Sequence, residues 1–549
     1  MFDYSILIGG AAGQGSRKAG LLIAKLFNNF GYRVFIHEDY QSLIKGGHNF
    51  SQIRASDEEV FSYREKIDFL LALDKNTIEK HQKNLAENGV IIYNSDEISL
   101  EKGIGIPARK ISKEEGGSLI MENTALIASF AKIVGIDWEI VENILRKEFQ
   151  EKSEINLKIA KHAYEEAQNL IKIEKVHKES LPLLTGNEAI ALGAVKAGLE
   201  IYFAYPMTPT SPILHYFAEH QKEFNLKVSQ LENEIAVINI AIGAAYAGAR
   251  TMVGTSGGGF ALMAEGLSLA AQSETPIVII EGQRMAPATG VPTYSAQSDL
   301  LFALNAGHGD FVRFVIAPGD ADEAFYLSGK ALNLAWKYQT PVILLLDKDL
   351  CESTFIFHPE IESKVEIEEP LLWDGKEDYK RYKITENGIS PLAFPGKKDI
   401  VVKTTSYEHD EVGITIEEDE NAIEKMQEKR LRKFKEMEKE VEKTEGAVKI
   451  YGNKESKEAI VAWGSTKGPA KEAVEKLGIK MIQPIFLEPF PEKEIKKSLE
   501  GVEKLIFVET NVLGQMEKLF NTYGITGQGR ILKYNGRPFT AEEIIEKLT

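Results

Sequence analysis

The sequence predicts an α/β protein composed of three α/β domains. Short apolar strand candidates alternate with segments of helical periodicity, a pattern typical of parallel sheets covered by helices. Glycine-rich turns follow several of these strands. A polar stretch interrupts the alternation, and the same pattern then returns, so we expect a linker ahead of the last domain.

The first predicted domain covers residues 1–173. A strand candidate at 6–8 leads into a glycine turn, and apolar residues then recur at helical spacing over 19–30. Further strand candidates lie at residues 34–36, 69–73 and 90–93. We expect these strands to form a parallel, doubly wound sheet.

A short linker at residues 174–182 separates the first domain from a second at 183–357. Two buried-strand candidates of that second domain lie at 277–280 and 342–346. Residues 358–450 are expected to be a linker with a charged helix at about 421–443, solvated and packed along one side. A coiled-coil partner site is the alternative for this helix. The third domain is predicted at 457–549, with strands at 459–463 and 505–508.

Composition excludes several classes of protein. The formal net charge is −17, with 82 acidic against 65 basic residues, which argues against a nucleic-acid partner. Cys351 is the single cysteine, so the chain cannot form an internal disulfide or hold an iron–sulfur cluster alone. No stretch has the length and apolar character of a membrane span, and the N-terminus lacks the features of a leader. We therefore expect a cytoplasmic enzyme without a membrane partner.

The most informative segment runs from Glu234 to Phe260. A single carboxylate begins a helix that is otherwise apolar and rich in small residues. A strand follows, and then the sequence Thr255-Ser256-Gly257-Gly258-Gly259, which we expect to form a turn that wraps a ligand. The alternative is that Glu234 only complements the dipole at a helix start.

A second segment, Tyr205-Pro206-Met207-Thr208-Pro209-Thr210-Ser211-Pro212, follows a strand at 201–204. Pro206 and Pro209 fix the backbone, and we expect the hydroxyls at positions 208, 210 and 211 to point outward. The alternative is an ordinary proline-stiffened loop whose hydroxyls cap the next helix.

A third segment, Glu281-Gly282-Gln283-Arg284, directly follows the strand at 277–280. An arginine at the carboxyl end of a strand is well placed to bind a carboxylate with its forked donors. The alternative is a surface ion pair. His308 lies between glycines further along the chain, where it serves either as a base or to orient a loop.

The first domain carries a glycine turn, Gly10-Ala11-Ala12-Gly13-Gln14-Gly15, at the start of a helix. Such a turn can hold a phosphate, although its spacing departs from the dinucleotide fingerprint. Tight packing of strand on helix is the alternative. A nucleotide-binding protein would also need an acidic residue for the ribose, and Glu38 and Asp39 loosely fit that role.

The glutamate, the alanine- and glycine-rich helix and the Thr-Ser-Gly segment resemble the pyrimidine-binding domain of thiamine diphosphate enzymes. The segment from Tyr205 to Ser211 resembles the Tyr-Pro-Ile-Thr-Pro-Ser-Ser loop of 2-oxoacid:ferredoxin oxidoreductase α subunits. Residues 287–310 and Glu408 to Glu411 are also similar to that family, and the first domain resembles its γ subunit. Nearly the whole chain thus resembles an α subunit of the 2-oxoglutarate synthase type with a fused N-terminal γ domain.

The resemblance implies three domains: a γ-like domain, a pyrimidine-binding domain and a C-terminal transketolase-like α/β domain. It also implies roles for individual residues. Glu234, which would bond the aminopyrimidine ring, Thr208 and Arg284 are the catalytic candidates. The cofactor-binding candidates are Tyr205, Pro206, Glu234, Thr255, Ser256 and Gly257, and those for coenzyme A or phosphate are Gly13, Gln14, Gly15 and Lys45. The resemblance assigns no metal ligand to this chain.

Two positions depart from the family pattern. The family usually has proline where Gly258 stands, and members of the 2-oxoglutarate type tend to have arginine where Tyr294 follows Pro292-Thr293. The second departure weakens the assignment of 2-oxoglutarate as substrate, so the particular 2-oxoacid stays open.

The chain contains no Gly-Asp-Gly segment, which a complete thiamine enzyme needs to hold Mg²⁺ and the diphosphate. The resemblance therefore implies a partner β subunit with that half of the site and the iron–sulfur cluster. Oxidative decarboxylation of a 2-oxoacid to acyl-CoA, with electrons passed to ferredoxin, is the expected reaction of the hetero-oligomer. A nucleotide-binding α/β protein and a non-catalytic assembly subunit are the two rival hypotheses.

Overall fold

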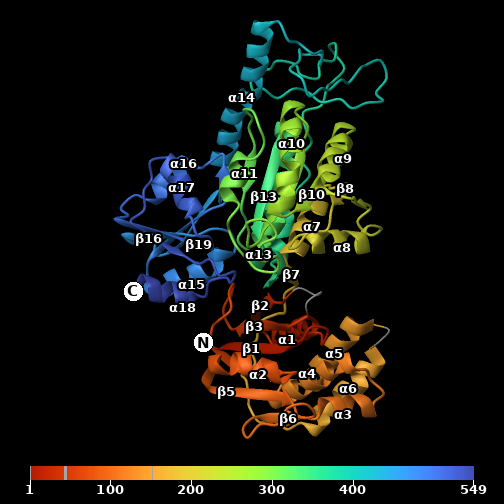
Figure 1. Ribbon diagram of the computed structural model, residues 1–549, viewed down its shortest axis with the longest axis vertical. Helices are drawn as coiled ribbons and strands as arrows, with labels where there is room; N and C mark the ends of the chain where they lie inside the picture. Colours follow the sequence, from red (N-terminus) through yellow and green to blue (C-terminus); the bar gives the residue numbers. More distant parts are fainter. Residues whose placement is uncertain (1, 42–45, 151–152) are drawn as a thin grey trace. The chain divides into compact units, whose positions relative to one another are not determined.

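The computed structural model describes residues 2–41, 46–150 and 153–549. These residues form two compact units. The first comprises Met1–Leu184 with the short segments Glu352–His358 and Thr540–Glu546, and the second comprises Thr185–Cys351, Pro359–Phe539 and Lys547–Thr549. Three sheets of eight, seven and five strands, with helices packed against them, confirm the predicted α/β class (Figure 1). The four domain ranges proposed from the sequence stay predictions.

The first unit contains most of an eight-stranded sheet with the order β6-β5-β4-β1-β3-β2-β14-β7. Its strands are β1 (Asp3–Ala11), β2 (Arg33–Asp39), β3 (His48–Ser56), β4 (Ile67–Ala72), β5 (Leu85–Asn94), β6 (Ile104–Ile106), β7 (Leu183–Thr185) and β14 (Thr354–Ile356). Its helices are α1 (Ser16–Asn29), α2 (Lys75–His81), α3 (Ala108–Glu114), α4 (Glu122–Ile133), α5 (Trp138–Phe149) and α6 (Ser153–Glu166).

The prediction of a parallel, doubly wound sheet in this unit is only partly right, because the sheet is mixed. The four predicted strands, β1, β2, β4 and β5, run in the same direction, but β3 lies between β1 and β2 and pairs antiparallel with both. The strand β3 escaped prediction because its buried positions include Ser51, Gln52 and Arg54. These side chains are satisfied inside the unit: Gln52 donates to Ser5 Oγ (3.0 Å), and Arg54 forms an ion pair with Asp3. A polar strand of this kind lacks the apolar pattern on which a prediction rests.

The second unit holds the remaining two sheets. The seven-stranded sheet has the order β18-β12-β13-β11-β10-β8-β9 and is parallel except for β18. Its strands are β8 (Ile201–Ala204), β9 (Lys227–Gln230), β10 (Thr251–Thr255), β11 (Ile277–Gln283), β12 (Phe314–Ile316), β13 (Pro341–Asp347) and β18 (Phe486–Glu488). The helices around it are α7 (Gly186–Lys196), α8 (Ser211–His220), α9 (Glu234–Tyr246), α10 (Gly257–Gln272), α11 (Leu300–Asn305), α12 (Ala321–Tyr338) and α13 (Lys348–Glu352).

Helices α9 and α10 cover one face of this sheet, where they pack on Val253, Ile277 and Ile279 (Figure 1). On the opposite face the ring of Tyr202 packs against Phe217 of α8, with centroids 5.0 Å apart. Because β8, β10 and β11 are parallel, their carboxyl ends meet at the same edge of the sheet. The loop after β8, the start of α10 and the residue after β11 therefore lie near one another.

The five-stranded sheet of the second unit has the order β15-β17-β16-β19-β20, and only β15 runs antiparallel. Its strands are β15 (Val448–Gly452), β16 (Glu458–Val461), β17 (Lys480–Pro484), β19 (Lys504–Glu509) and β20 (Gly529–Leu532). Its helices are α15 (Lys467–Leu477), α16 (Glu492–Ser498) and α17 (Gln515–Thr522). The last helix of the chain, α18 (Ala541–Leu548), belongs for the most part to the first unit. Val461, Ile482 and Phe507 share an apolar core with Leu345 of β13, so the two sheets pack together.

The charged helix predicted at 421–443 is α14 (Glu420–Lys443). Its stripe of Met426, Met437 and Val441 is buried, as expected for a helix packed along one side. The stripe also includes two buried lysines that the sequence did not indicate. Lys429 and Lys433 both form ion pairs with the buried Glu274, at the end of α10.

Candidate functional site

Glu234 is the first residue of α9, and its side chain is buried. The helix start is already capped, because the side chain of Asn233 accepts a hydrogen bond from the backbone N–H of Ala236 (2.9 Å). The Glu234 carboxylate is only 3% exposed, and its Oε1 has no hydrogen-bond partner among the described residues. Burial of an unpaired carboxylate costs free energy that a helix start alone does not repay, so the carboxylate is suited to a ligand.

The glycine cluster after β10 forms part of α10 and does not wrap as a turn, contrary to the prediction. Ser256 is the N-cap of α10, and Gly257, Gly258 and Gly259 form its first turn. A Cβ at Gly259 would lie 2.4 Å from Glu234 Oε1 and 2.1 Å from Thr255 Oγ1. Glycine at this position therefore lets the Glu234 carboxylate contact the backbone of α10 directly.

The loop after β8 is tied to β10 from within. Thr210 is 2% exposed, and its hydroxyl donates to the carbonyl oxygens of Met207 and Thr255, both at 3.2 Å. The expectation that this hydroxyl points outward was therefore wrong. Thr208 is half-buried and Tyr205 is exposed, on the part of the same loop that precedes Pro209.

Arg284 joins this loop to the end of β11. Its Nη1 donates to the carbonyl oxygen of Thr208 at 2.9 Å. The guanidinium is half-buried, and burial lowers its pKa while the charges of Asp299 and Glu234 oppose that shift. Arg284 thus lies in the field of two carboxylates at the sheet edge. The structure brings together the three residues that the sequence analysis named as catalytic.

Two further carboxyl groups of this site were not named as site residues from the sequence. Glu281 on β11 is fully buried, pairs in register with Thr255 of β10, and has no hydrogen-bond partner for either oxygen within the described part of the chain. Burial raises the pKa of Glu281 well above its ordinary value, and Asp299 adds to that shift. Burial also raises the pKa of Asp299 to about 6, against the lowering effect of Arg284.

A signal for Glu281 exists in the sequence, because it is a carboxylate that directly continues an apolar parallel strand. Asp299 gives no such signal. It follows a loop, and its position beside Gly257 depends on the fold: a Cβ at Gly257 would lie 2.5 Å from Asp299 Oδ2.

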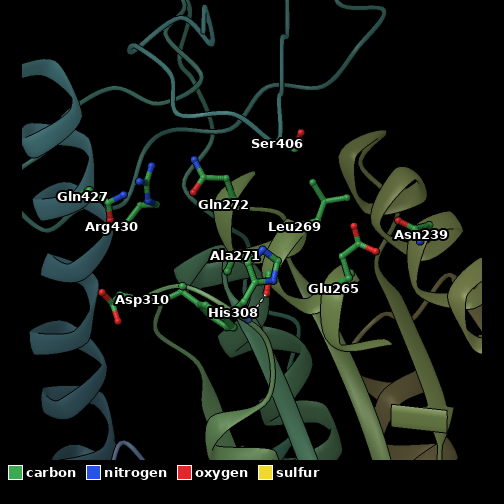
Figure 2. A pocket seen from close by; sticks show the side chains of 14 residues that line it. Asn239, Glu265, Leu269, Ala271, Gln272, His308, Asp310, Ser406, Gln427 and Arg430 are labelled. Atoms are coloured by element: carbon green, nitrogen blue, oxygen red, sulfur yellow. Dashed lines mark hydrogen bonds between the residues drawn. The ribbon is translucent and has the colours of Figure 1, made fainter. Parts of the chain in front are cut away.

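His308 lies away from Glu234. It lines a pocket of about 730 Å³ together with Glu265 and Leu269 of α10 and Arg430 of α14 (Figure 2). Leu269 is ten residues beyond Gly259 on α10, which is roughly 15 Å at the rise of an α-helix. The backbone N–H of His308 donates to Ser268 Oγ at 2.8 Å, as expected for a residue that orients a loop.

The glycine turn of the first unit leads into α1. Gly13 and Gly15 have positive φ values of 95° and 76°, and no atom would lie within 4 Å of a Cβ at Gly13. Gln14 closes the turn, since its Oε1 accepts from the backbone N–H of Ala11 at 2.7 Å. The first turn of α1 carries no acidic residue. Lys45, the fourth candidate here, lies outside the described residues.

Other residues singled out in the sequence have structural surroundings of their own. Glu38 is buried on β2 and accepts a hydrogen bond from Ser51 Oγ at 2.7 Å. The ring of Tyr294 lies under the guanidinium of Arg537, 3.7 Å from its carbon to the ring centroid. An arginine from a distant part of the sequence thus packs on the residue that departs from the family pattern.

None of the described helices has the length and apolar character that crossing a membrane requires. Within the described ranges, no group of three or more His, Cys, Asp or Glu side chains is placed to hold a metal ion.

Three family models match consecutive parts of the chain. Residues 5–166 match pyruvate ferredoxin/flavodoxin oxidoreductase, and residues 192–429 match the thiamine diphosphate-binding domain of pyruvate flavodoxin/ferredoxin oxidoreductase. Residues 456–544 match core domain II of pyruvate:ferredoxin oxidoreductase. The sheet edge with Glu234 lies within the second match, and this defines an oxidoreductase of the thiamine diphosphate class.

Full-length relatives narrow the class. The chain is 35% identical to the 2-oxoacid:ferredoxin oxidoreductase subunit alpha of Saccharolobus solfataricus, over 99% of this chain and 96% of that protein. It is 26% identical to the 2-oxoglutarate oxidoreductase subunit KorA of Mycobacterium tuberculosis, over 98% and 90% of the two chains. The solved 2-oxoglutarate:ferredoxin oxidoreductase of Magnetococcus marinus, with 2-oxoglutarate, coenzyme A and succinyl-CoA bound, has a TM-score of 0.90 at 30% identity, covering 100% of this chain and 99% of that one. The chain belongs to the family of 2-oxoacid:ferredoxin oxidoreductase α subunits.

Proposed function

We propose that Glu234 is the acid–base group that acts on the pyrimidine ring of thiamine diphosphate, within a complex that oxidises a 2-oxoacid. The observation that carries the proposal is the unpartnered, buried Glu234 oxygen against the first turn of α10. Such a carboxylate fits a ring nitrogen that exchanges a proton with it. When bound, thiamine diphosphate supplies the carbon that attacks the substrate and stabilises the resulting negative charge.

The residues around Glu234 fit a flat, partly polar ring. Ser256 Oγ is buried without a hydrogen-bond partner in the described structure, and Gly258 leaves open space beside it. We assign Tyr205, Pro206, Thr255, Ser256 and Gly257 to the walls of this cofactor site. Their proposed task is to orient the ring and to exclude water from the Glu234 carboxylate.

Arg284 and Thr208 are proposed to bind the carboxylate end of the 2-oxoacid. The guanidinium has five N–H donors, of which one is used for the Thr208 carbonyl. Its half-buried position strengthens its attraction for an anion relative to a site in open water. The particular 2-oxoacid stays open.

The second half of the cofactor site is proposed to come from a partner β subunit, which would carry the Mg²⁺–diphosphate site and the iron–sulfur cluster and pass electrons to ferredoxin. Support comes from the outer face of α9 and α10 beside Glu234, where Ile235, Ile240 and Leu262 are 50%, 45% and 49% exposed. Large apolar side chains exposed on two adjacent helices are a feature of protein interfaces.

The overall reaction joins a 2-oxoacid with coenzyme A, releases CO₂ and transfers two electrons to the acceptor. For coenzyme A we propose a phosphate contact at Gly13, Gln14, Gly15 and Lys45. The open backbone at Gly13 and the helix start of α1 support this contact, since the N-terminus of a helix attracts anions. A nucleotide-binding protein without thiamine chemistry, or a non-catalytic assembly subunit, is disfavoured by the family membership.

The test replaces Glu234 with glutamine in the assembled complex. Glu234→Gln keeps the size of the side chain but cannot cycle a proton in the same way. It is expected to retain thiamine diphosphate and to slow hydrogen–deuterium exchange at the cofactor C2 carbon, measured by NMR after acid quench. The matched control is Glu232→Gln, since Glu232 is an exposed carboxylate two residues earlier. Equal exchange rates in wild type and Glu234→Gln would reduce Glu234 to a helix-start carboxylate.

A further inference from the structure

The site contains more negative groups than the proposed chemistry uses. Glu234, Glu281 and Asp299 lie around the first turn of α10 and the end of β11, and Arg284 is the cation near Glu234 and Asp299. If all three carboxyl groups were ionised, two of the charges would be unbalanced in a mostly buried space. Like charges in such a space cannot all ionise, so at least one of these groups holds a proton.

Glu281 is the group whose protonated form is favoured most strongly. It is fully buried on the strand, and neither of its oxygens receives a hydrogen bond from the described residues. Without a donor or a cation in contact, its ionised form has no compensation for the loss of water. Burial therefore favours the uncharged form of Glu281, and the charges that act on Arg284 are those of Asp299 and Glu234.

The position of Asp299 is fixed through its backbone and its side-chain contact with α10. Its N–H donates to Gln283 Oε1 at 2.9 Å, and Gln283 Nε2 donates to the carbonyl oxygen of Leu346 at 3.0 Å. The Asp299 carboxylate occupies the space that a side chain at Gly257 would fill. Its Oδ2 is buried without a hydrogen-bond partner in the described part of the chain. The carboxylate is thus held at the site while one oxygen is left for a ligand or a proton.

We propose that Asp299 is the exchangeable counterion of Arg284. Asp299 takes up a proton from solvent when the carboxylate of a 2-oxoacid binds to Arg284. The inference rests on the proposed function, because it requires Arg284 to bind substrate. In the absence of substrate, the charge of Asp299 balances the guanidinium. When the substrate brings a second negative charge, protonation of Asp299 removes the repulsion between the two carboxylates. Asp299 is a positioning residue in this arrangement and does not react itself.

The charged and titratable groups that face Asp299 set the pH range. Arg284 opposes its protonation, burial favours the uncharged form of Glu281, and Glu234 also acts on Arg284. The first turn of α10 contributes no acidic side chain. On β13, Asp347 accepts hydrogen bonds from the backbone N–H groups of Ser465 and Leu350 and so faces the five-stranded sheet. Because the pKa of Asp299 is raised to about 6, the exchange is expected above about pH 6.

The experiment is calorimetric titration of the assembled complex with oxamate, a 2-oxoacid analogue that is not decarboxylated. Titrations at one pH in buffers of different ionisation enthalpy give the number of protons taken up. Wild type is expected to take up a proton between about pH 6 and pH 8, and its affinity is expected to fall by up to about tenfold per pH unit in that range. Asp299→Asn removes the proton uptake and the pH dependence, and Asp299→Glu retains both. The matched control is Asp310→Asn, on an exposed loop.

The outcomes separate the two proposals. Wild type that binds oxamate without proton uptake overturns the role of Asp299, and this measurement needs no variant to fold. Asp299→Asn with the wild-type proton count overturns it as well. A complex that binds no oxamate and oxidises no 2-oxoacid overturns the proposed function together with the inference, whereas a normal result for Glu234→Gln overturns only the assignment of Glu234.

Discussion

Gly259→Ala tests whether the glycine cluster exists to seat the Glu234 carboxylate. Gly259 has an ordinary helical φ, so alanine is allowed by the backbone, and in an open position it would stabilise the helix by about 0.5–1 kcal/mol. Here the added methyl group would lie 2.1 Å from Thr255 Oγ1 and 2.4 Å from Glu234 Oε1, where ordinary contacts begin near 3.4 Å. The carboxylate must move by about 1 Å.

Gly258→Ala is the matched control for stability, because no atom would lie within 4 Å of its Cβ. Overpacking a buried site typically costs about 1–3 kcal/mol. We therefore expect Gly259→Ala to be about 1–3 kcal/mol less stable than Gly258→Ala, measured as midpoints of thermal unfolding of the isolated chain. A 1 Å misplacement of a catalytic group can cost about 10²-fold in rate, so C2 exchange in the complex should slow by about that factor. Equal unfolding midpoints and an unchanged exchange rate in Gly259→Ala would refute the reasoning.

Three other changes have expected outcomes. Arg284→Ala should lose about 2–5 kcal/mol of transition-state binding in kcat/KM, and Arg284→Lys should lose part of it because the fork is gone; an unchanged kcat/KM in Arg284→Ala removes it from the site. The raised pKa of Glu281 means that the folded chain keeps a proton which the unfolded chain loses above about pH 4.3, so stability falls as pH rises; Glu281→Gln should abolish this loss, and an identical pH profile of unfolding would contradict it. Glu274→Gln should destabilise by about 3–5 kcal/mol because it leaves Lys429 and Lys433 buried without their anion, whereas Glu265→Gln on the exposed side of α10 should not.

The sequence allowed the position of the site to be predicted because the relevant segments follow parallel strands. Thr208, Thr255 and Arg284 each come shortly after or at the end of a strand, and the carboxyl ends of parallel strands meet at one edge. The hydrogen bond from Arg284 to the Thr208 carbonyl is the direct result of that arrangement. Such a prediction needs only strand order and direction, which the apolar pattern of the strands already suggests.

Groups that are polar and buried at the same time were not predicted. Strand β3, Glu281, Lys429 and Lys433 all place charged or amide side chains where a sequence pattern expects apolar ones. For strand β3 and the two lysines, the fold supplies the hydrogen bonds or ion pairs that satisfy the buried groups. Glu281 is instead left without a hydrogen-bond partner among the described residues. Lys429 and Lys433 meet Glu274 across more than 150 sequence positions, and no local periodicity can indicate such a pairing. Asp299 likewise enters the site only because Gly257 leaves room for its carboxylate.

The three glycines at the start of α10 therefore have different tasks. Gly257 makes room for Asp299, and Gly259 makes room for Glu234, so a side chain at either position would displace a carboxylate of the site. Gly258 faces open space and is exposed, and it is the position where the related family usually has proline. Proline is well tolerated in the first turn of a helix, because the N–H it lacks has no partner within the helix there. The departure at Gly258 thus lies at the one glycine of the three where an added Cβ would meet no carboxylate, so we expect it to leave the positions of Glu234 and Asp299 unchanged.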